Sequence, residues 1–125
     1  MNTVVEARLI GAVATGGALG AAARHLLVQA WPAGPAGFPV ATFVINVGGC
    51  LAIGALLGVR RGPMSRAFLG TGVLGGFTTF SAYAVQSDVL WRTGRPAVAV
   101  GYVLATLVCA LAAVRLGTLL VRSRR

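Results

Sequence analysis

The sequence predicts an all-α membrane protein with four transmembrane helices, and three observations support that fold class. Apolar residues make up 57% of the 125 residues, whereas charged residues make up only 10%. An ordinary soluble domain is about 25% charged, so this chain has too few charged side chains to cover a water-facing surface. The basic residues, all of them arginine, separate long apolar stretches of the length that membrane helices need.

Composition and length also exclude several other classes of protein. A net charge of +9 can indicate a nucleic-acid partner, but these arginines form no dense basic face, and we expect no nucleic acid. The hydrophobicity rules out disorder. The length allows a single domain, residues 1–125. One membrane chain of this size is small for enclosing a pathway alone, so we expect an oligomer surrounded by membrane lipid.

Charges and turn residues divide the chain into four spans, at about residues 8–30, 40–59, 67–90 and 96–119. The uncharged stretch 26–59 is too long for one helix, and its Pro/Gly-rich segment Trp31–Pro39 predicts a turn between two spans. The first span reaches full length only if Arg24 lies near its end and extends toward water. A secretory signal ending near Ala21–Ala23 is an alternative for this stretch, but three further spans already explain membrane insertion.

Arginine placement predicts the orientation of the chain. With four spans, both termini and the 60–66 loop lie on one side of the membrane, and that side carries most of the arginines. The positive-inside rule therefore favours cytoplasmic N- and C-termini. The arginines on that side are Arg8, Arg60, Arg61, Arg66, Arg115, Arg122, Arg124 and Arg125, against Arg24, Arg92 and Arg95 on the other.

Small residues recur inside the spans at a spacing of four, which suits close helix packing in lipid. The pairs are Gly16 with Gly20, Gly54 with Gly58 and Gly72 with Gly76, and Gly48 and Gly49 add to the pattern. Together they predict a compact bundle. We expect Cys50 and Cys109, one on each of two spans, to act as small packing residues rather than as a metal site.

The third span carries the most informative polar sequence, Gly72–Tyr83, near the expected middle of the membrane. Gly75 and Gly76 are followed by Thr78 and Thr79, and both residue types are poor helix formers. An unwound turn here would free backbone carbonyls, which membrane proteins use to hold Na⁺. A straight helix whose threonine hydroxyls bond back to the preceding turn is equally compatible with the sequence.

Uncharged polar groups on the other spans suit an anion better than a cation. Asn46 lies near the middle of the second span, and Tyr102 and Thr106 share one face of the fourth. Amide and hydroxyl groups donate hydrogen bonds, and the edge of a phenyl ring is its positive part. The two acids, Glu6 and Asp88, lie at span ends. A proton-coupled exporter normally needs an ionisable group inside the membrane, so their position argues against one.

Arg24 has two interpretations from sequence. It is either an anchor at the membrane surface or part of a positive vestibule that concentrates anions at a pore entrance.

Three segments resemble the CrcB/Fluc fluoride channel family, in the family's order and in the matching spans. They are Gly16–Arg24, Thr42–Gly49 and Gly75–Ser81, and the last contains the specific run Gly-Gly-Phe-Thr-Thr-Phe-Ser. The resemblance covers essentially the whole chain. It implies a passive channel that exports fluoride from the cytoplasm of a bacterium, across the cell membrane, and so lowers its toxicity.

The resemblance also implies an assembly and a set of site residues. These are an antiparallel dimer, a third helix broken at mid-membrane, and a structural Na⁺ at the dimer interface held by the Gly75 and Thr78 carbonyls. By motif position, the fluoride pathway takes Arg24 as its vestibule residue. Its lining comprises Phe80, Tyr83, Asn46, Thr79, Tyr102 and Thr106.

The chain departs from the family pattern at three points. Tyr83 stands where the second pore phenylalanine is usual, and Gln86 stands where an acid is common, with Asp88 two residues beyond. The arginine bias also commits the chain to one orientation, whereas single-gene members insert both ways. We therefore expect a dimer either with itself or, by hypothesis, with a related subunit of opposite orientation.

Two other functions stay open as alternatives. A small four-helix multidrug or cation exporter has the same size but needs an intramembrane carboxylate, and Glu6 precedes the first apolar run. A non-transporting assembly subunit leaves Asn46, Thr79 and Tyr102 without a purpose. The sequence offers no nucleophile–base pair or metal cluster, so we expect no enzyme and no catalytic residues.

Overall fold

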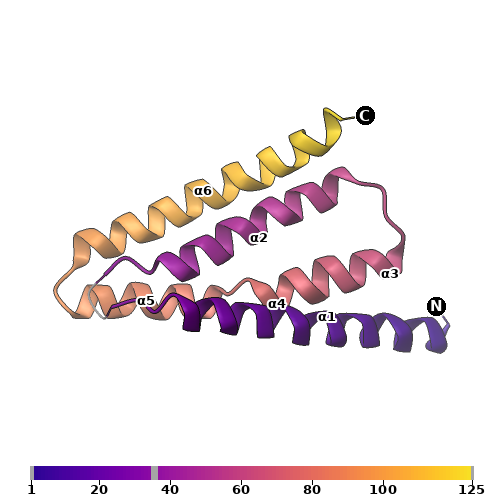
Figure 1. Cartoon of the computed structure of the whole chain (residues 1–125), viewed down its shortest axis with the longest axis horizontal. Helices are drawn as coiled ribbons and strands as arrows, with labels where there is room; N and C mark the ends of the chain where they lie inside the picture. Colours follow the sequence, from indigo (N-terminus) through magenta and orange to yellow (C-terminus); the bar gives the residue numbers. More distant parts are fainter. Residues whose placement is uncertain (1, 35–36, 125) are drawn as a thin grey trace.

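The computed structural model describes residues 2–34 and 37–124, and the regular structure in this part of the chain is helical (Figure 1). Four helices are long and apolar enough to cross a membrane, as the sequence predicted. The third of these is divided into shorter segments. The elements are α1 (Thr3–Ala30), α2 (Val40–Gly58), α3 (Pro63–Arg66), η1 (Ala67–Leu74), α4 (Gly75–Phe77), α5 (Phe80–Arg92) and α6 (Pro96–Arg122).

The helices pack mainly as two pairs. α2 lies along α6, and α1 lies along η1 and α4, while α5 closes the bundle against α6 (Figure 1). The two ends of the chain lie at the same end of the bundle as the link between α2 and α3. α1 begins at Thr3 rather than near residue 8, and α6 continues to Arg122 rather than ending near 119. These extensions carry both helices beyond the apolar stretches that defined the expected spans.

Small residues allow α1 to approach the third span closely. A Cβ atom added to Gly20 would lie 2.8 Å from the backbone nitrogen of Phe77, and one added to Gly72 would lie 3.0 Å from Cα of Gly16. Helices in lipid associate by such backbone approach. The sequence analysis placed Gly48 among the packing glycines, but a Cβ there would meet no atom within 4 Å in the described part of the chain.

α2 and α6 are joined by a similar small-residue contact and by a hydroxyl. A Cβ at Gly117 would lie 2.8 Å from the backbone nitrogen of Ala55, so α6 contributes a packing glycine that the sequence analysis did not single out. Thr118 Oγ1 donates to the Gly54 carbonyl at 3.0 Å and to the Val114 carbonyl at 2.9 Å. This hydroxyl therefore connects the two helices far from the middle of the third span.

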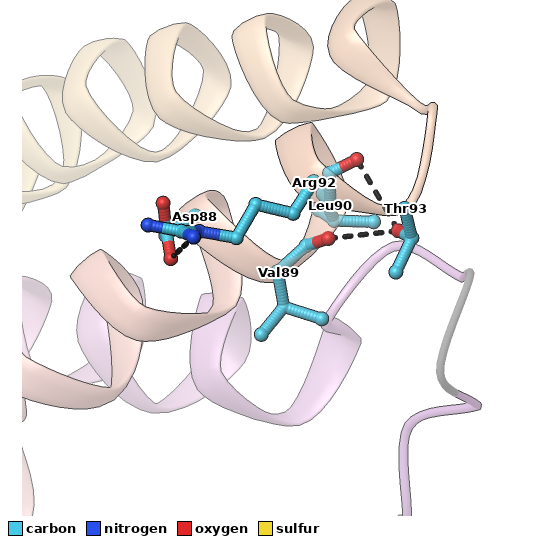
Figure 2. A network of polar contacts seen from close by, with 5 residues as sticks. All are labelled: Asp88, Val89, Leu90, Arg92 and Thr93. Atoms are coloured by element: carbon cyan, nitrogen blue, oxygen red, sulfur yellow. Dashed lines mark hydrogen bonds and ion pairs between the residues drawn. The ribbon is translucent and has the colours of Figure 1, made fainter.

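The end of α5 shows where one of the two acids lies. Arg92 Nε donates to Asp88 Oδ2 at 2.7 Å, and the Thr93 hydroxyl donates to the Val89 and Leu90 carbonyls to finish the helix (Figure 2). Both members of the ion pair are well exposed. Gly94 follows with φ 77°, a left-handed conformation that glycine adopts easily, and reverses the chain into α6.

Large apolar side chains cover much of the outer surface of the bundle. Among them are Ile10, Leu26, Phe80, Leu111 and Leu119, each more than 60% exposed in the single chain. A soluble monomer rarely exposes apolar surface on this scale, so lipid or another subunit must cover it.

Candidate functional site at the helix break

The third span is interrupted at its two threonines. Thr78 (φ −77°, ψ 157°) and Thr79 (φ −146°, ψ 122°) have extended backbone between α4 and α5. The two side chains act differently: the Thr78 hydroxyl donates to the Leu74 carbonyl at 3.0 Å, whereas Thr79 Oγ1 accepts the Ala82 N–H at 3.2 Å and caps α5. The glycines Gly75 and Gly76, by contrast, remain helical in α4.

The Asn46 side chain, from α2, binds the Thr79 peptide at this interruption. Asn46 Oδ1 accepts the Thr79 N–H at 2.9 Å, and Asn46 Nδ2 donates to the Thr79 carbonyl at 2.9 Å. The Thr79 N–H can only donate, so this pair fixes which way the amide points. One N–H of the Asn46 amide is left over from the pair.

Arg24 approaches the same interruption from α1. Its Nε donates to the Gly76 carbonyl at 3.2 Å, and the residue is half-buried. A cation near the carboxyl end of a helical segment is favourable, because the last carbonyls carry partial negative charge. α1 ends at Ala30, as the expected first span does, but the Arg24 guanidinium turns toward the Gly76 carbonyl of the third span rather than extending toward water.

The contacts made by Asn46 and by the Thr79 hydroxyl give new acceptors to two N–H groups. In a continuous α-helix, both would donate to backbone carbonyls. The Thr79 N–H would pair with the Gly75 carbonyl, and the Ala82 N–H would pair with the Thr78 carbonyl. Instead they donate to Asn46 Oδ1 and Thr79 Oγ1. The Gly75 and Thr78 oxygens are the two that the resemblance nominated for Na⁺. Backbone carbonyl oxygens are suitable ligands for a hard cation, so the residues present fit such an ion.

A groove of about 280 Å³ lies beside the break. Five of the predicted pathway residues line it, together with apolar neighbours from α2 and α6. Its lining comprises Asn46, Thr79, Phe80, Tyr83 and Thr106, with Cys50, Ile53, Thr78, Leu107 and Ala110. The structure therefore brings these predicted residues into one place.

Two aromatic rings stand at this groove. Phe80 is 78% exposed in the single chain, and its ring centroid lies 5.8 Å from that of Tyr83. The Tyr83 hydroxyl donates to the Val103 carbonyl on α6 at 3.0 Å. This bond directs the hydroxyl proton to the backbone. The hydroxyl that distinguishes Tyr83 from phenylalanine therefore already donates its hydrogen bond within the protein.

The fourth-span residues Tyr102 and Thr106 differ in their surroundings. Tyr102 is fully buried, its ring centroid 5.3 Å from that of Tyr83, and its hydroxyl donates to Gln86 Oε1 at 3.0 Å. Gln86 thus serves as an acceptor, a role that the sequence analysis did not assign. Thr106 is buried at the groove, and its hydroxyl has no hydrogen-bond partner among the described residues.

A second cavity of about 410 Å³ adjoins the other side of Thr79. Arg24, Thr42 and Gln86 line it with Thr79, so the break borders both this space and the groove. Arg24 contributes the positive charge of this second cavity. Asp88 takes no part in it, because its carboxylate pairs with Arg92 at the exposed end of α5 (Figure 2).

The chain is similar in sequence to known proteins over most of its length. The chain is 51% identical over 109 residues to the "Fluoride-specific ion channel FluC" of Paracoccus denitrificans, an alignment that covers 84% of this chain and 87% of that one. It is 42% identical over 119 residues to "Fluoride-specific ion channel FluC 2" of Nocardia farcinica, with 91% and 85% covered. "Fluoride-specific ion channel FluC 1" of Streptomyces coelicolor is 45% identical over 114 residues, with 87% and 74% covered. The family described as "CrcB-like protein, Camphor Resistance (CrcB)" matches residues 11–118, and the chain, a multi-pass membrane protein, belongs to it.

Proposed function

We propose that the chain is a subunit of a fluoride-specific channel, which lets cytoplasmic fluoride leave the cell passively, and that it is not an enzyme. The observation that carries this proposal is the groove at the break. There the side chains of Asn46, Thr106, Phe80 and Tyr83 gather without a carboxylate. The names of the relatives point to the same ion.

Fluoride is small and strongly hydrated. A pore that strips water molecules from the ion must therefore supply other hydrogen-bond donors or positive groups in their place. The remaining N–H of Asn46 and the unpartnered hydroxyl of Thr106 can each donate one hydrogen bond to the anion. The rings of Phe80 and Tyr83 present positive edges. Apart from Thr78 and Thr79, the remaining walls are apolar, which strengthens each of these interactions by lowering the local dielectric.

Arg24 gives the pathway its positive potential. It lines the cavity on the other side of Thr79, where a fixed charge between low-dielectric walls concentrates anions. Its bond to the Gly76 carbonyl gives it a second role, as a brace for the break. We therefore assign Arg24 to the vestibule and keep it out of the pore lining.

We further infer that the functional assembly is an antiparallel dimer with the break at mid-membrane. Phe80 and Gly75 lie within the third membrane span and are exposed in the single chain, and a second subunit would cover them. When bound, Na⁺ supplies a fixed positive charge at the interface, and the Gly75 and Thr78 carbonyls would hold it.

The arginine distribution supports cytoplasmic termini and one fixed orientation. An antiparallel partner then has to insert the other way. We propose a related subunit of opposite orientation as that partner. Robust fluoride flux from the lone chain would contradict an obligatory partner and favour a dimer with itself.

Passive export needs no coupling group. Neutral hydrogen fluoride crosses membranes from acidic surroundings and dissociates in the cytoplasm, and the trapped anion then leaves down its electrochemical gradient. The cation-exporter alternative lacks its essential group, because Asp88 is paired with Arg92 at an exposed helix end and Glu6 lies in the first turn of α1.

The test is an efflux measurement from liposomes with a fluoride electrode, run beside the same measurement for chloride. A fluoride channel releases fluoride and retains chloride. Proteoliposomes that release neither ion, with or without the related subunit, would refute the channel and leave the non-transporting assembly subunit.

A further inference from the structure

One side chain accounts for the interruption of the third span. Asn46 makes both of its bonds to the peptide of Thr79, a residue 33 positions away in the sequence. α2 packs mainly along α6, so Asn46 ties the break to the opposite helix pair. The contact replaces the bond that would otherwise run from the Thr79 N–H to the Gly75 carbonyl within the helix.

We propose that Asn46 is the positioning residue for the interfacial cation, because it holds the Thr79 peptide out of the helix and so keeps the Gly75 oxygen free. This inference rests on the proposed function, in which the Gly75 and Thr78 oxygens hold Na⁺. Asn46 does not touch the ion. It acts through the backbone that carries one of the oxygens.

The physical reason is the competition for a single N–H group. A buried backbone N–H without a partner is costly, so Thr79 must donate either to Asn46 or to Gly75. An aliphatic side chain of the same shape at position 46 removes the first acceptor. Thr79 then regains a partner by winding back toward the helix, which engages the Gly75 oxygen and withdraws it from a cation.

The Thr78 oxygen is freed by a separate contact. Its helical partner, the Ala82 N–H, donates to Thr79 Oγ1 at 3.2 Å. Because that hydroxyl belongs to Thr79, its position also depends on the peptide that Asn46 holds. One amide from α2 therefore governs both oxygens.

Flux alone cannot test this role, because Asn46 also lines the groove. We suggest measuring the melting temperature of the purified full chain, in the assembly it forms, against Na⁺ concentration. N-methylglucamine would keep the ionic strength constant. A cation that binds only the folded state raises the melting temperature in proportion to the logarithm of its concentration, once that exceeds the dissociation constant.

The variant is Asn46→Leu, and the matched control is Thr118→Val. Both remove a half-buried side chain's bonds to backbone, but Thr118 binds the Gly54 and Val114 carbonyls, away from the break. Asn46→Leu is expected to raise the Na⁺ concentration at which the melting temperature begins to rise by about tenfold or more, because the Gly75 oxygen is then engaged by the Thr79 N–H and lost to the cation. Thr118→Val is expected to lower the melting temperature and leave that concentration unchanged.

The outcomes separate this inference from the proposed function. If the melting temperature of Asn46→Leu begins to rise at the same Na⁺ concentration as that of wild type, the positioning role is overturned while the channel stands. A wild-type protein that Na⁺ does not stabilise also overturns it, and fluoride efflux from the same preparation then judges the channel independently. If Asn46→Leu does not fold, Asn46→Ala loses the same two bonds without added bulk, and the melting temperature of that variant must show the same shift in the Na⁺ concentration at which it begins to rise.

Discussion

Replacing Thr106 by valine should make the protein more stable and the channel slower. Valine has nearly the shape of threonine but lacks the hydroxyl. The Thr106 hydroxyl is buried at the groove, and its oxygen has no partner among the described residues. A protein that keeps an unpaired buried hydroxyl is expected to use it on a ligand.

The size of both effects can be worked from this geometry. An unsatisfied buried polar group costs about 1–3 kcal/mol, so Thr106→Val should gain stability up to that amount. A hydrogen bond to a charged partner contributes about 1.5–3 kcal/mol, so its loss should reduce fluoride flux roughly tenfold to a hundredfold. The two effects have opposite signs, which a general disturbance of packing does not produce.

The assays are thermal unfolding of the purified protein and fluoride efflux from liposomes at equal protein content. Thr118→Val, on the same helix, is the control, because its hydroxyl is fully used by two carbonyls. It should lose about 0.5–1.5 kcal/mol per hydrogen bond and keep its flux per assembled channel. A Thr106→Val protein that is less stable than wild type and conducts fluoride at the full rate would refute the reasoning.

Three further substitutions and one matched control test other parts of the structure. Phe80→Ile should abolish fluoride efflux, because it removes the ring edge, and leave assembly intact in size-exclusion chromatography, because isoleucine keeps an apolar side chain on this exposed face of the single chain; undiminished efflux would remove this ring from the pore. Gly20→Ala should lower stability by about 1–3 kcal/mol in thermal unfolding, since its Cβ would lie 2.8 Å from the Phe77 nitrogen. Gly11→Ala is the control on the same helix, and it should be tolerated because a Cβ at Gly11 would meet no atom within 4 Å. If Gly11→Ala and Gly20→Ala lowered stability equally, the packing described would be contradicted. Asp88→Asn should change stability by less than about 1 kcal/mol and leave efflux unaltered, because its ion pair with Arg92 is solvent-exposed; a large loss of efflux would place the carboxylate in the pathway.

The four apolar helices could be predicted from sequence because charges and a Pro/Gly turn mark their ends directly. The aromatic, amide and hydroxyl residues of the groove could be selected because they are polar or aromatic groups inside apolar spans. Thr79 at the break, Asn46 on α2 and Thr106 on α6 then lie around one groove. Their selection needed only composition and the family resemblance.

The position of the backbone interruption could not be read from local propensity. Gly75 and Gly76 are weak helix formers, yet they stay helical, and a Cβ added to Gly76 would lie 3.0 Å from Cα of Gly17 on α1. The small size of Gly76 therefore serves helix packing, whereas a Cβ added to Gly75 would come no closer than 3.9 Å to a neighbouring atom. The π-helical segment η1, just before them, also has no local signature in the sequence.

Contacts between distant segments set the remaining details of the site. The pairing of Asn46 with Thr79 and the turn of Arg24 toward Gly76 join residues that no local pattern links. The same holds for Gln86 and Tyr102, and for Gly117, which packs on α2 without a glycine partner four residues away. Such contacts depend on which helices become neighbours.

The most direct measurement is an experimental density map of the purified channel in lipid with Na⁺ and fluoride present. We predict that Thr78 and Thr79 have extended backbone at mid-membrane, that the Asn46 amide lies against the Thr79 peptide, and that the Gly75 and Thr78 oxygens face a bound cation. A continuous third helix, with the Thr79 N–H donating to the Gly75 carbonyl and no ion beside it, would contradict this structure of the pathway.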